Sequence, residues 1–130
     1  MTSAELRARR LGMGKTQRQM AELVGVSLRA VHSFEQGWRK VPVYVERQIL
    51  FLAMLAHRSN TPVEDCWKIK RCRPDVRAQC PAWELKAGQF CWFINGTLCA
   101  GKLQRTWKAK MEICRRCKVF QDAVPAAVAG

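Results

Sequence analysis

The sequence predicts a mainly α-helical protein: an N-terminal domain of four or five helices, then a small, irregular, cysteine-rich module stabilised by metal. Two observations support this. Apolar residues recur at helical spacing through the first 58 residues. All seven cysteines lie between Cys66 and Cys117. We therefore expect these parts: a helical domain at 1–58, a linker at 59–62, the cysteine-rich module at 63–121 and a disordered tail at 122–130.

Composition and charge narrow the function classes. The chain has 130 residues, a hydrophobic fraction of 48% and a formal net charge of +13. The hydrophobic fraction excludes a wholly disordered chain. The charge suits a polyanion, because each neutralised phosphate releases counterions, although a basic surface can also serve solubility alone.

The location of the protein is predicted from its apolar segments. The N-terminus has no apolar stretch typical of a secretory signal. The longest apolar run, Ile49 to Ala56, is too short to span a membrane. We expect a cytoplasmic protein without membrane contact, whose thiols stay reduced.

The first predicted helix spans residues 4–12 and ends at Gly12. Leu6 and Leu11 are expected to make apolar contacts. The arginines of this helix are expected to lie mostly in water: Arg7, Arg9 and Arg10.

The next two helices are predicted from their capping residues. Thr16 can begin the second helix through a capping box with Gln19. Gly25 suits the left-handed residue that ends it. Ser27 can then cap a third helix that runs from Leu28 to about Gln36. Two short helices joined by such a turn form the helix-turn-helix pattern.

At these residues the sequence resembles the Cro/phage-repressor helix-turn-helix family. The resemblance rests on the string from Thr16 to Ser27, on Val31 and on the Phe34-Glu35-Gln36-Gly37 end, and it covers roughly residues 4–58. Two positions depart from the family pattern: Gln19, where an acidic residue is common, and His32, where a small polar residue is usual. The resemblance implies a repressor-like fold with the third helix in the major groove of double-stranded DNA.

The resemblance also implies which residues contact DNA. Arg29 is the best candidate for base readout, because a guanidinium can bond guanine O6 and N7 together. Leu28 suits a thymine methyl group, and Glu35 is expected to be structural. The full set of expected DNA-contacting residues is Lys15, Thr16, Gln17, Ser27, Leu28, Arg29, His32, Ser33, Gln36, Arg39 and Lys40. The alternative is that these are solvated surface groups.

Pro42 suits the start of a fourth helix that runs to about Arg58. Its run from Ile49 to Ala56 is apolar on all sides, whereas a domain of this size buries only one face of a helix. We expect a homodimer formed through this helix. Burial against the second half of the same chain is the alternative.

The cysteines leave three kinds of site open. Disulfides are disfavoured by a reducing compartment and by the odd number. Zinc usually takes paired thiolates, and only Cys114 and Cys117 have that spacing. An iron–sulfur cluster tolerates scattered ligands, so we slightly favour it over zinc, with inert cysteines as a further alternative. The candidate metal ligands are Cys66, Cys72, Cys80, Cys91, Cys99, Cys114 and Cys117.

The second half resembles the two-CW domain, a cysteine-rich bacterial module with two Cys-Trp pairs. Here the pairs are Cys66-Trp67 and Cys91-Trp92, and the rest of the pattern includes Cys80-Pro81, Gly96-Thr97-x-Cys99 and Cys114-x2-Cys117. The module occurs beside signalling domains, so the resemblance implies a sensory role without naming the signal.

Together these features predict a sequence-specific transcriptional regulator, modulated through a cysteine-bound metal or cluster that senses redox state, oxygen or metal. One alternative is a constitutive repressor with a structural zinc module, and another is a protein-interaction adaptor. We expect no enzyme, because both histidines, His32 and His57, lie in the first half and no catalytic set is evident. A thiol redox enzyme is a minor alternative.

Overall fold

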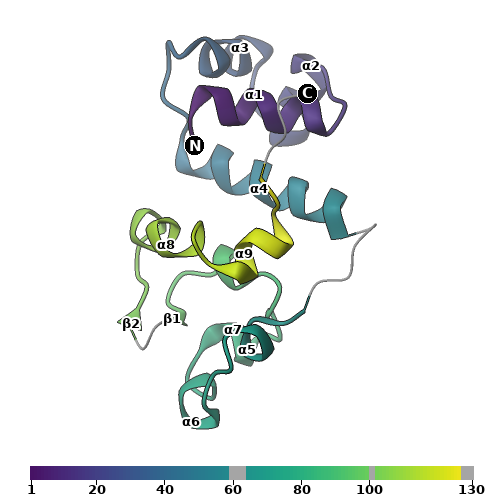
Figure 1. Ribbon diagram of the computed structural model, residues 1–130. Helices are drawn as coiled ribbons and strands as arrows, with labels where there is room; N and C mark the ends of the chain where they lie inside the picture. The colour runs from purple at the N-terminus through teal and green to yellow at the C-terminus, as the bar shows by residue number, and fades with distance from the viewer. Residues whose placement is uncertain (59–63, 100–101, 127–130) are drawn as a thin grey trace. The chain divides into compact units, whose positions relative to one another are not determined.

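The computed structural model describes residues 1–58, 64–99 and 102–126 (Figure 1). The protein is mainly helical, as the sequence predicted. It divides into two compact units, which we call the N-terminal unit (Met1–Ala56) and the C-terminal unit (His57–Pro125). The predicted linker at 59–62 lies outside the described residues.

The N-terminal unit is built from α1 to α4, and α3 packs against both α1 and α2. The bounds are α1 Ser3–Gly12, α2 Gln17–Val24, α3 Leu28–Gln36 and α4 Val43–Arg58. Each lies within one residue of its predicted range. The predicted start and end residues explain this agreement, because helix caps are local interactions.

The caps of α2 and α3 are those predicted. Thr16 and Gln19 form a complete capping box at the start of α2. Gly25 ends α2 with φ +78°, a left-handed conformation that favours glycine. The Ser27 hydroxyl accepts a 3.0 Å hydrogen bond from the Ala30 amide at the start of α3.

An apolar core joins the four helices. Its buried members are Leu6, Met20, Val24, Ala30, Phe34, Val41, Val45 and Ile49.

Two predictions for α1 were wrong. Leu11 is 40% exposed, because its spacing of five residues from buried Leu6 places it on a different side of the helix. Arg9 is buried beside Glu5, and Arg10 is largely buried beside Glu35, because each guanidinium bonds a carboxylate.

Only part of α4 belongs to this core. Val45 and Ile49 contact α1–α3 residues within it, whereas Val43, Tyr44 and Leu55 are exposed. The expected dimer through α4 stays a prediction.

The C-terminal unit is made of short elements. Its bounds are α5 Cys66–Ile69, α6 Pro74–Arg77, α7 Pro81–Glu84, the 3₁₀ helix η1 Cys91–Phe93, β1 Leu98–Cys99, β2 Lys102–Leu103, α8 Trp107–Cys114 and α9 Lys118–Ala123. The two strands pair antiparallel, with Leu98 opposite Leu103. The predicted tail at 122–130 begins inside α9, and Val124 is buried. Residues 127–130 lie outside the described residues.

Aromatic packing around Trp92 supports the C-terminal unit. The Trp92 side chain is fully buried, and its indole N–H donates to the Gln89 carbonyl at 3.2 Å. Its ring lies edge-on to Phe120 and Trp107, at centroid distances of 5.6 and 6.5 Å. Such pairs stabilise beyond their buried area, so this unit has more apolar core than its sequence suggested.

Gly88 has less free space around its Cα than Gly96, the other described glycine of the C-terminal unit. Its carbonyl accepts a 2.8 Å hydrogen bond from the Cys66 amide. A Cβ at this position would lie 2.6 Å from Asp65 Cβ and 2.9 Å from the Trp67 ring. A methyl group there would therefore push the start of α5 away.

Gly88→Ala is expected to destabilise the C-terminal unit by about 1–3 kcal/mol, the usual cost of overpacking. The measurement is thermal unfolding followed by tryptophan fluorescence, since four of the five tryptophans lie in this unit. Gly12→Ala is the matched control, because a Cβ there meets nothing within 4 Å. Equal melting temperatures for the two variants would contradict the prediction.

Candidate nucleic-acid interface and cysteine-lined cavity

The residues predicted to contact DNA lie at the start of α2, on the outer face of α3 and in the turns that flank α3. Most of them are exposed: Thr16, Ser27, Leu28, Arg29, His32, Gln36, Arg39 and Lys40. The others are half-buried: Lys15, Gln17 and Ser33. No described carboxylate forms an ion pair with Arg29, so its guanidinium has free hydrogen-bond donors.

Two predicted contact residues already use their side chains as caps. The Thr16 hydroxyl accepts from the Gln19 amide at 3.1 Å, and the Ser27 hydroxyl accepts from the Ala30 amide at 3.0 Å. Each cap fixes where a helix begins. The positions of Gln17, Leu28 and Arg29 on the surface follow from these two helix starts.

A buried ion pair braces α3 against α1. Arg10 binds both oxygens of Glu35, at 2.8 and 2.9 Å, and donates to the Lys15 carbonyl at 3.0 Å. The Glu35 side chain is only 3% exposed. The structural role predicted for Glu35 is therefore confirmed. Bidentate pairing also fixes the orientation of α3.

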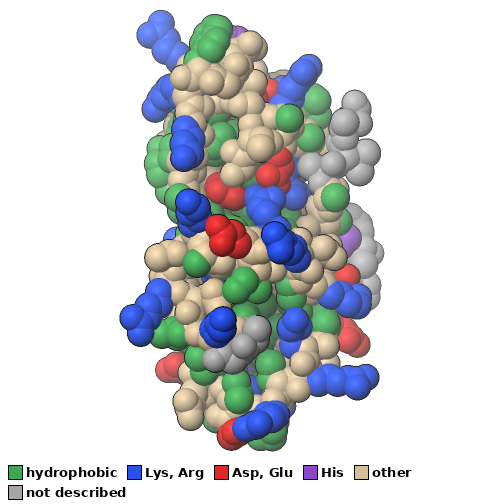
Figure 2. Space-filling model, turned by 60° about the vertical axis from the view of Figure 1, so that its left-hand side comes forward, with side chains coloured by type: hydrophobic (Ala, Val, Ile, Leu, Met, Phe, Trp, Pro, Cys, Tyr) green, Lys and Arg blue, Asp and Glu red, His purple; other side chains and the backbone are tan. Residues whose placement is uncertain are grey.

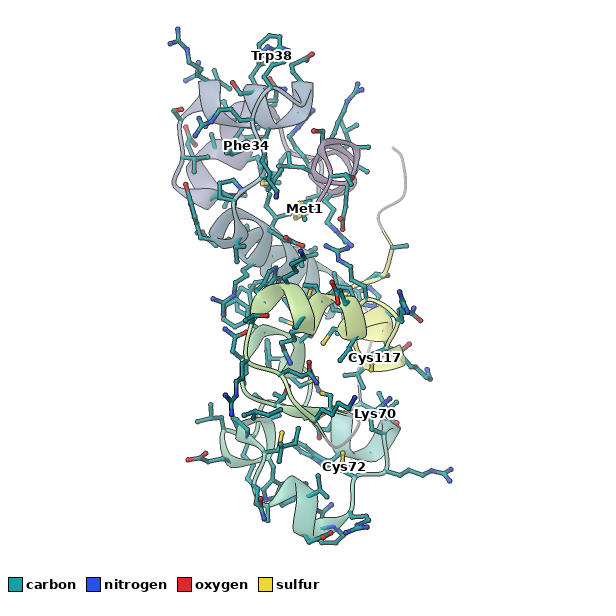
Figure 3. The ribbon with its side chains drawn as sticks, turned by 90° about the vertical axis from the view of Figure 1, so that its left-hand side faces the viewer. Met1, Phe34, Trp38, Lys70, Cys72 and Cys117 are labelled. Atoms are coloured by element: carbon teal, nitrogen blue, oxygen red, sulfur yellow. The ribbon has the colours of Figure 1, made fainter. Side chains whose placement is uncertain are left out.

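Trp38 belongs to this surface and was missed by the sequence prediction. Its side chain is 71% exposed (Figure 3). Its ring lies edge-on to that of His32, with 5.4 Å between centroids. The Arg39 guanidinium in turn lies 5.2 Å from the Phe34 ring centroid. A large aromatic residue directly after Gly37 was the available signal.

Positive charge does not single out this surface by itself. Figure 2 shows Lys and Arg side chains over the whole visible face, with no one patch that holds most of them. The α3 surface is therefore distinguished by its geometry rather than by its charge.

All seven cysteines line one cavity in the C-terminal unit. Its volume is about 270 Å³, and Trp92, Thr97 and Phe120 also line it. Three of the lining residues are labelled in Figure 3: Lys70, Cys72 and Cys117. The cysteines are all free thiols, and they come from segments 51 residues apart in the chain at the extremes, Cys66 and Cys117.

The thiols share the cavity without forming a closed ligand shell. Within the described ranges, no group of three or more His, Cys, Asp or Glu side chains is placed to hold a metal ion. A hydrogen bond between Cys91 and Cys66 lowers the pKa of Cys66 and raises that of Cys91. Burial raises the pKa of Cys114 to about 11, against the opposing effect of Lys110.

A buried lysine lies behind one wall of the cavity. Lys110 in α8 is fully buried, and its Nζ donates to Thr97 Oγ1 at 2.6 Å. The same oxygen lies 3.5 Å from Cys99 Sγ. The Thr97 hydroxyl thus lies between the Lys110 ammonium and the Cys99 thiol, and both Thr97 and Cys99 line the cavity.

The donor chemistry of the cavity fits a soft metal. Thiolates are the preferred ligands of zinc and of iron–sulfur clusters, and a buried cation nearby favours an anionic centre. The size is informative as well. A zinc ion lies only about 2.3 Å from its thiolates, so a single zinc site needs much less space than the 270 Å³ observed.

The longest described helix, α4, has 16 residues, and no described helix combines the length and apolarity of a membrane span.

In comparisons with known proteins, no family model, no curated protein and no solved structure matches the chain.

Proposed function

We propose that the protein is a sequence-specific DNA-binding transcriptional regulator. The observation that carries this proposal is the α2–turn–α3 arrangement, with both helix starts capped and the outer face of α3 exposed. In the helix-turn-helix mode the second of these helices lies in the major groove. The ion pair between Arg10 and Glu35 supports the proposal, because it joins α3 to α1 and so fixes the orientation of α3.

Six of the surface residues have a stated role in this proposal. Arg29 reads guanine through two hydrogen bonds, and Leu28 contacts a thymine methyl group. Four residues bind phosphates and set the docking angle: Lys15, Gln36, Arg39 and Lys40. A homodimer would place two copies of α3 on half-sites about 34 Å apart along the DNA.

The decisive experiment is selection of binding sites from randomised duplex DNA with the full chain. We expect a short enriched motif, repeated with two-fold symmetry if the protein binds as a dimer. Equal affinity for all duplexes at moderate salt would overturn the proposal. Absence of DNA binding, together with capture of a protein partner by the α3 face, would instead indicate the adaptor alternative.

Lys40→Ala is expected to weaken binding to all duplexes alike. It should also reduce the slope of log affinity against log salt concentration by about 1, because one phosphate contact is lost. The measurement is the slope of log affinity against log salt concentration. Lys108→Ala is the control, because this exposed lysine lies on α8, outside the proposed interface. An unchanged slope for Lys40→Ala would show that Lys40 does not contact a phosphate in the complex.

We further propose that a cysteine-bound centre in the cavity modulates DNA binding. The ligands would come from the seven cysteines that line it. A bound iron–sulfur cluster would supply redox and oxygen sensitivity, whereas a bound zinc would act structurally. The cavity volume favours the cluster.

Metal and sulfide analysis of anaerobically purified protein, with an optical spectrum, tests this second proposal. We expect iron, sulfide and a visible absorption band, and a change in DNA affinity when the centre is oxidised or removed. Zinc with unchanged DNA affinity would indicate the constitutive repressor. Colourless, metal-free and fully folded protein would overturn the proposal of a cysteine-bound centre without affecting the DNA-binding proposal.

A further inference from the structure

Lys110 is the least expected buried residue of the C-terminal unit. It lies in the middle of α8, its side chain is 0% exposed, and its helix neighbours Trp107, Met111 and Cys114 are also buried. Its Nζ donates to one neutral acceptor, Thr97 Oγ1, at 2.6 Å. In the described residues no carboxylate forms an ion pair with it.

A single hydroxyl is poor compensation for a buried ammonium group. Transfer of a charge from water to a protein interior is costly unless the charge is paired and hydrogen-bonded. Lysines are almost never fully buried without a partner. A negative charge near Lys110 would therefore stabilise the fold considerably.

Three thiols lie near Lys110. Thr97 Oγ1 lies 3.5 Å from Cys99 Sγ. A hydrogen bond to a neighbouring thiol raises the pKa of Cys91, burial raises the pKa values of Cys91 and Cys114, and the positive charge of Lys110 lowers both. Lys110 is therefore close enough to interact electrostatically with both thiols. These three cysteines come from β1, η1 and α8, and all of them line the cavity.

The Thr97 hydroxyl is placed to connect the cation with the sulfur. Its oxygen accepts from Lys110, which leaves its own hydrogen available for donation to Cys99. Thr97 is itself fully buried, so water does not compete for this hydrogen bond. Hydrogen bonds to ligand sulfurs are a known means of tuning metal–thiolate centres.

We propose that Lys110 is the internal counter-charge of an anionic thiolate–metal centre in the cavity, linked to Cys99 by the Thr97 hydroxyl. This inference rests on the centre proposed above. Four thiolates outnumber the positive charges of a zinc ion or of an iron–sulfur core, so either centre carries net negative charge. Lys110 is a positioning residue in this scheme and not a metal ligand.

The proposal predicts that Lys110→Met stabilises the metal-free (empty) protein but weakens metal binding in the metal-bound (loaded) protein. In the metal-free protein Lys110 is an uncompensated buried cation, so Lys110→Met should raise the melting temperature. In the loaded protein the same variant removes the counter-charge. Retention of the metal should fall about 10- to 100-fold, the usual effect of losing an outer-shell partner, and the reduction potential of a cluster should fall.

The test uses the full chain, stripped of metal and then reloaded anaerobically either with Zn²⁺ alone or with Fe²⁺ and sulfide. Metal retention is measured by competition with a chelator, the potential by redox titration, and stability by thermal unfolding. Lys108→Met is the matched control, because Lys108 is exposed on the same helix. It should leave all three measurements unchanged.

Thr97→Val provides a second, crossed variant that keeps the lysine. It removes the acceptor of Lys110, so it should lower the melting temperature of the metal-free protein while it also weakens metal retention. The counter-charge role is supported if Lys110→Met raises and Thr97→Val lowers the melting temperature of the metal-free protein, while both variants weaken metal retention.

Two results would overturn the inference. If Lys110→Met lowers the metal-free melting temperature or fails to fold, while the wild-type protein retains metal, Lys110 is an ordinary structural hydrogen-bond donor. If the wild-type protein retains neither Zn²⁺ nor iron and sulfide, the centre itself is absent and the inference falls with it.

Discussion

Replacement of Glu35 with alanine is expected to destabilise the N-terminal unit by about 3–5 kcal/mol, the usual cost of breaking a buried ion pair by removing one partner. The Arg10 guanidinium makes two hydrogen bonds to this carboxylate, and both side chains are largely buried. Without Glu35 the charge of Arg10 would stay buried with only the Lys15 carbonyl as acceptor.

Urea unfolding followed by circular dichroism measures this effect. Glu22→Ala is the control, since Glu22 is exposed on α2, and it should change stability by less than about 0.5 kcal/mol. The double variant Arg10→Met with Glu35→Leu should recover much of the loss, because it removes both charges together. A loss below about 1 kcal/mol for Glu35→Ala would show that the brace contributes little to stability.

Replacement of Arg29 with alanine is expected to weaken binding to the selected operator by about 1–3 kcal/mol, or roughly 5- to 150-fold. The reason is the loss of a bidentate contact to guanine from an exposed position near the start of α3. Sequence preference should relax at one base pair in each half-site.

Fluorescence anisotropy with labelled operator, and with variants at each base pair, measures both effects. Arg7→Ala is the control, because Arg7 is exposed on α1 outside the proposed interface and carries the same charge. Equal losses of affinity for the two variants would show that Arg29 contributes charge only, and no loss for either variant would exclude base readout by Arg29.

The sequence predicted the N-terminal unit well, because its signals are local. Thr16, Gly25, Ser27 and Gly37 each act within a few residues of their own position. The burial of Arg10 could not be predicted in the same way. Its partner, Glu35, lies 25 residues along the chain, and only packing of α3 against α1 brings the two together.

The cysteine-lined cavity was harder to predict than the N-terminal helices. Irregular spacing indicated candidate ligands but not that all seven thiols would meet at one cavity. The short helices α5, α6 and α7 have four residues each, too few for apolar periodicity to appear. Lys110 looks like a surface lysine in the sequence, because the burial of its side chain depends on Thr97, thirteen residues away.

The guanidinium of Arg10 joins three parts of the N-terminal unit: α1, the turn before α2, and α3. If α3 binds DNA as proposed, these contacts already hold it in place in the free protein, so it would lose little conformational entropy on docking. A substitution on α1 that moves Arg10 would then weaken the affinity of this proposed interface for DNA without changing the residues that read the sequence.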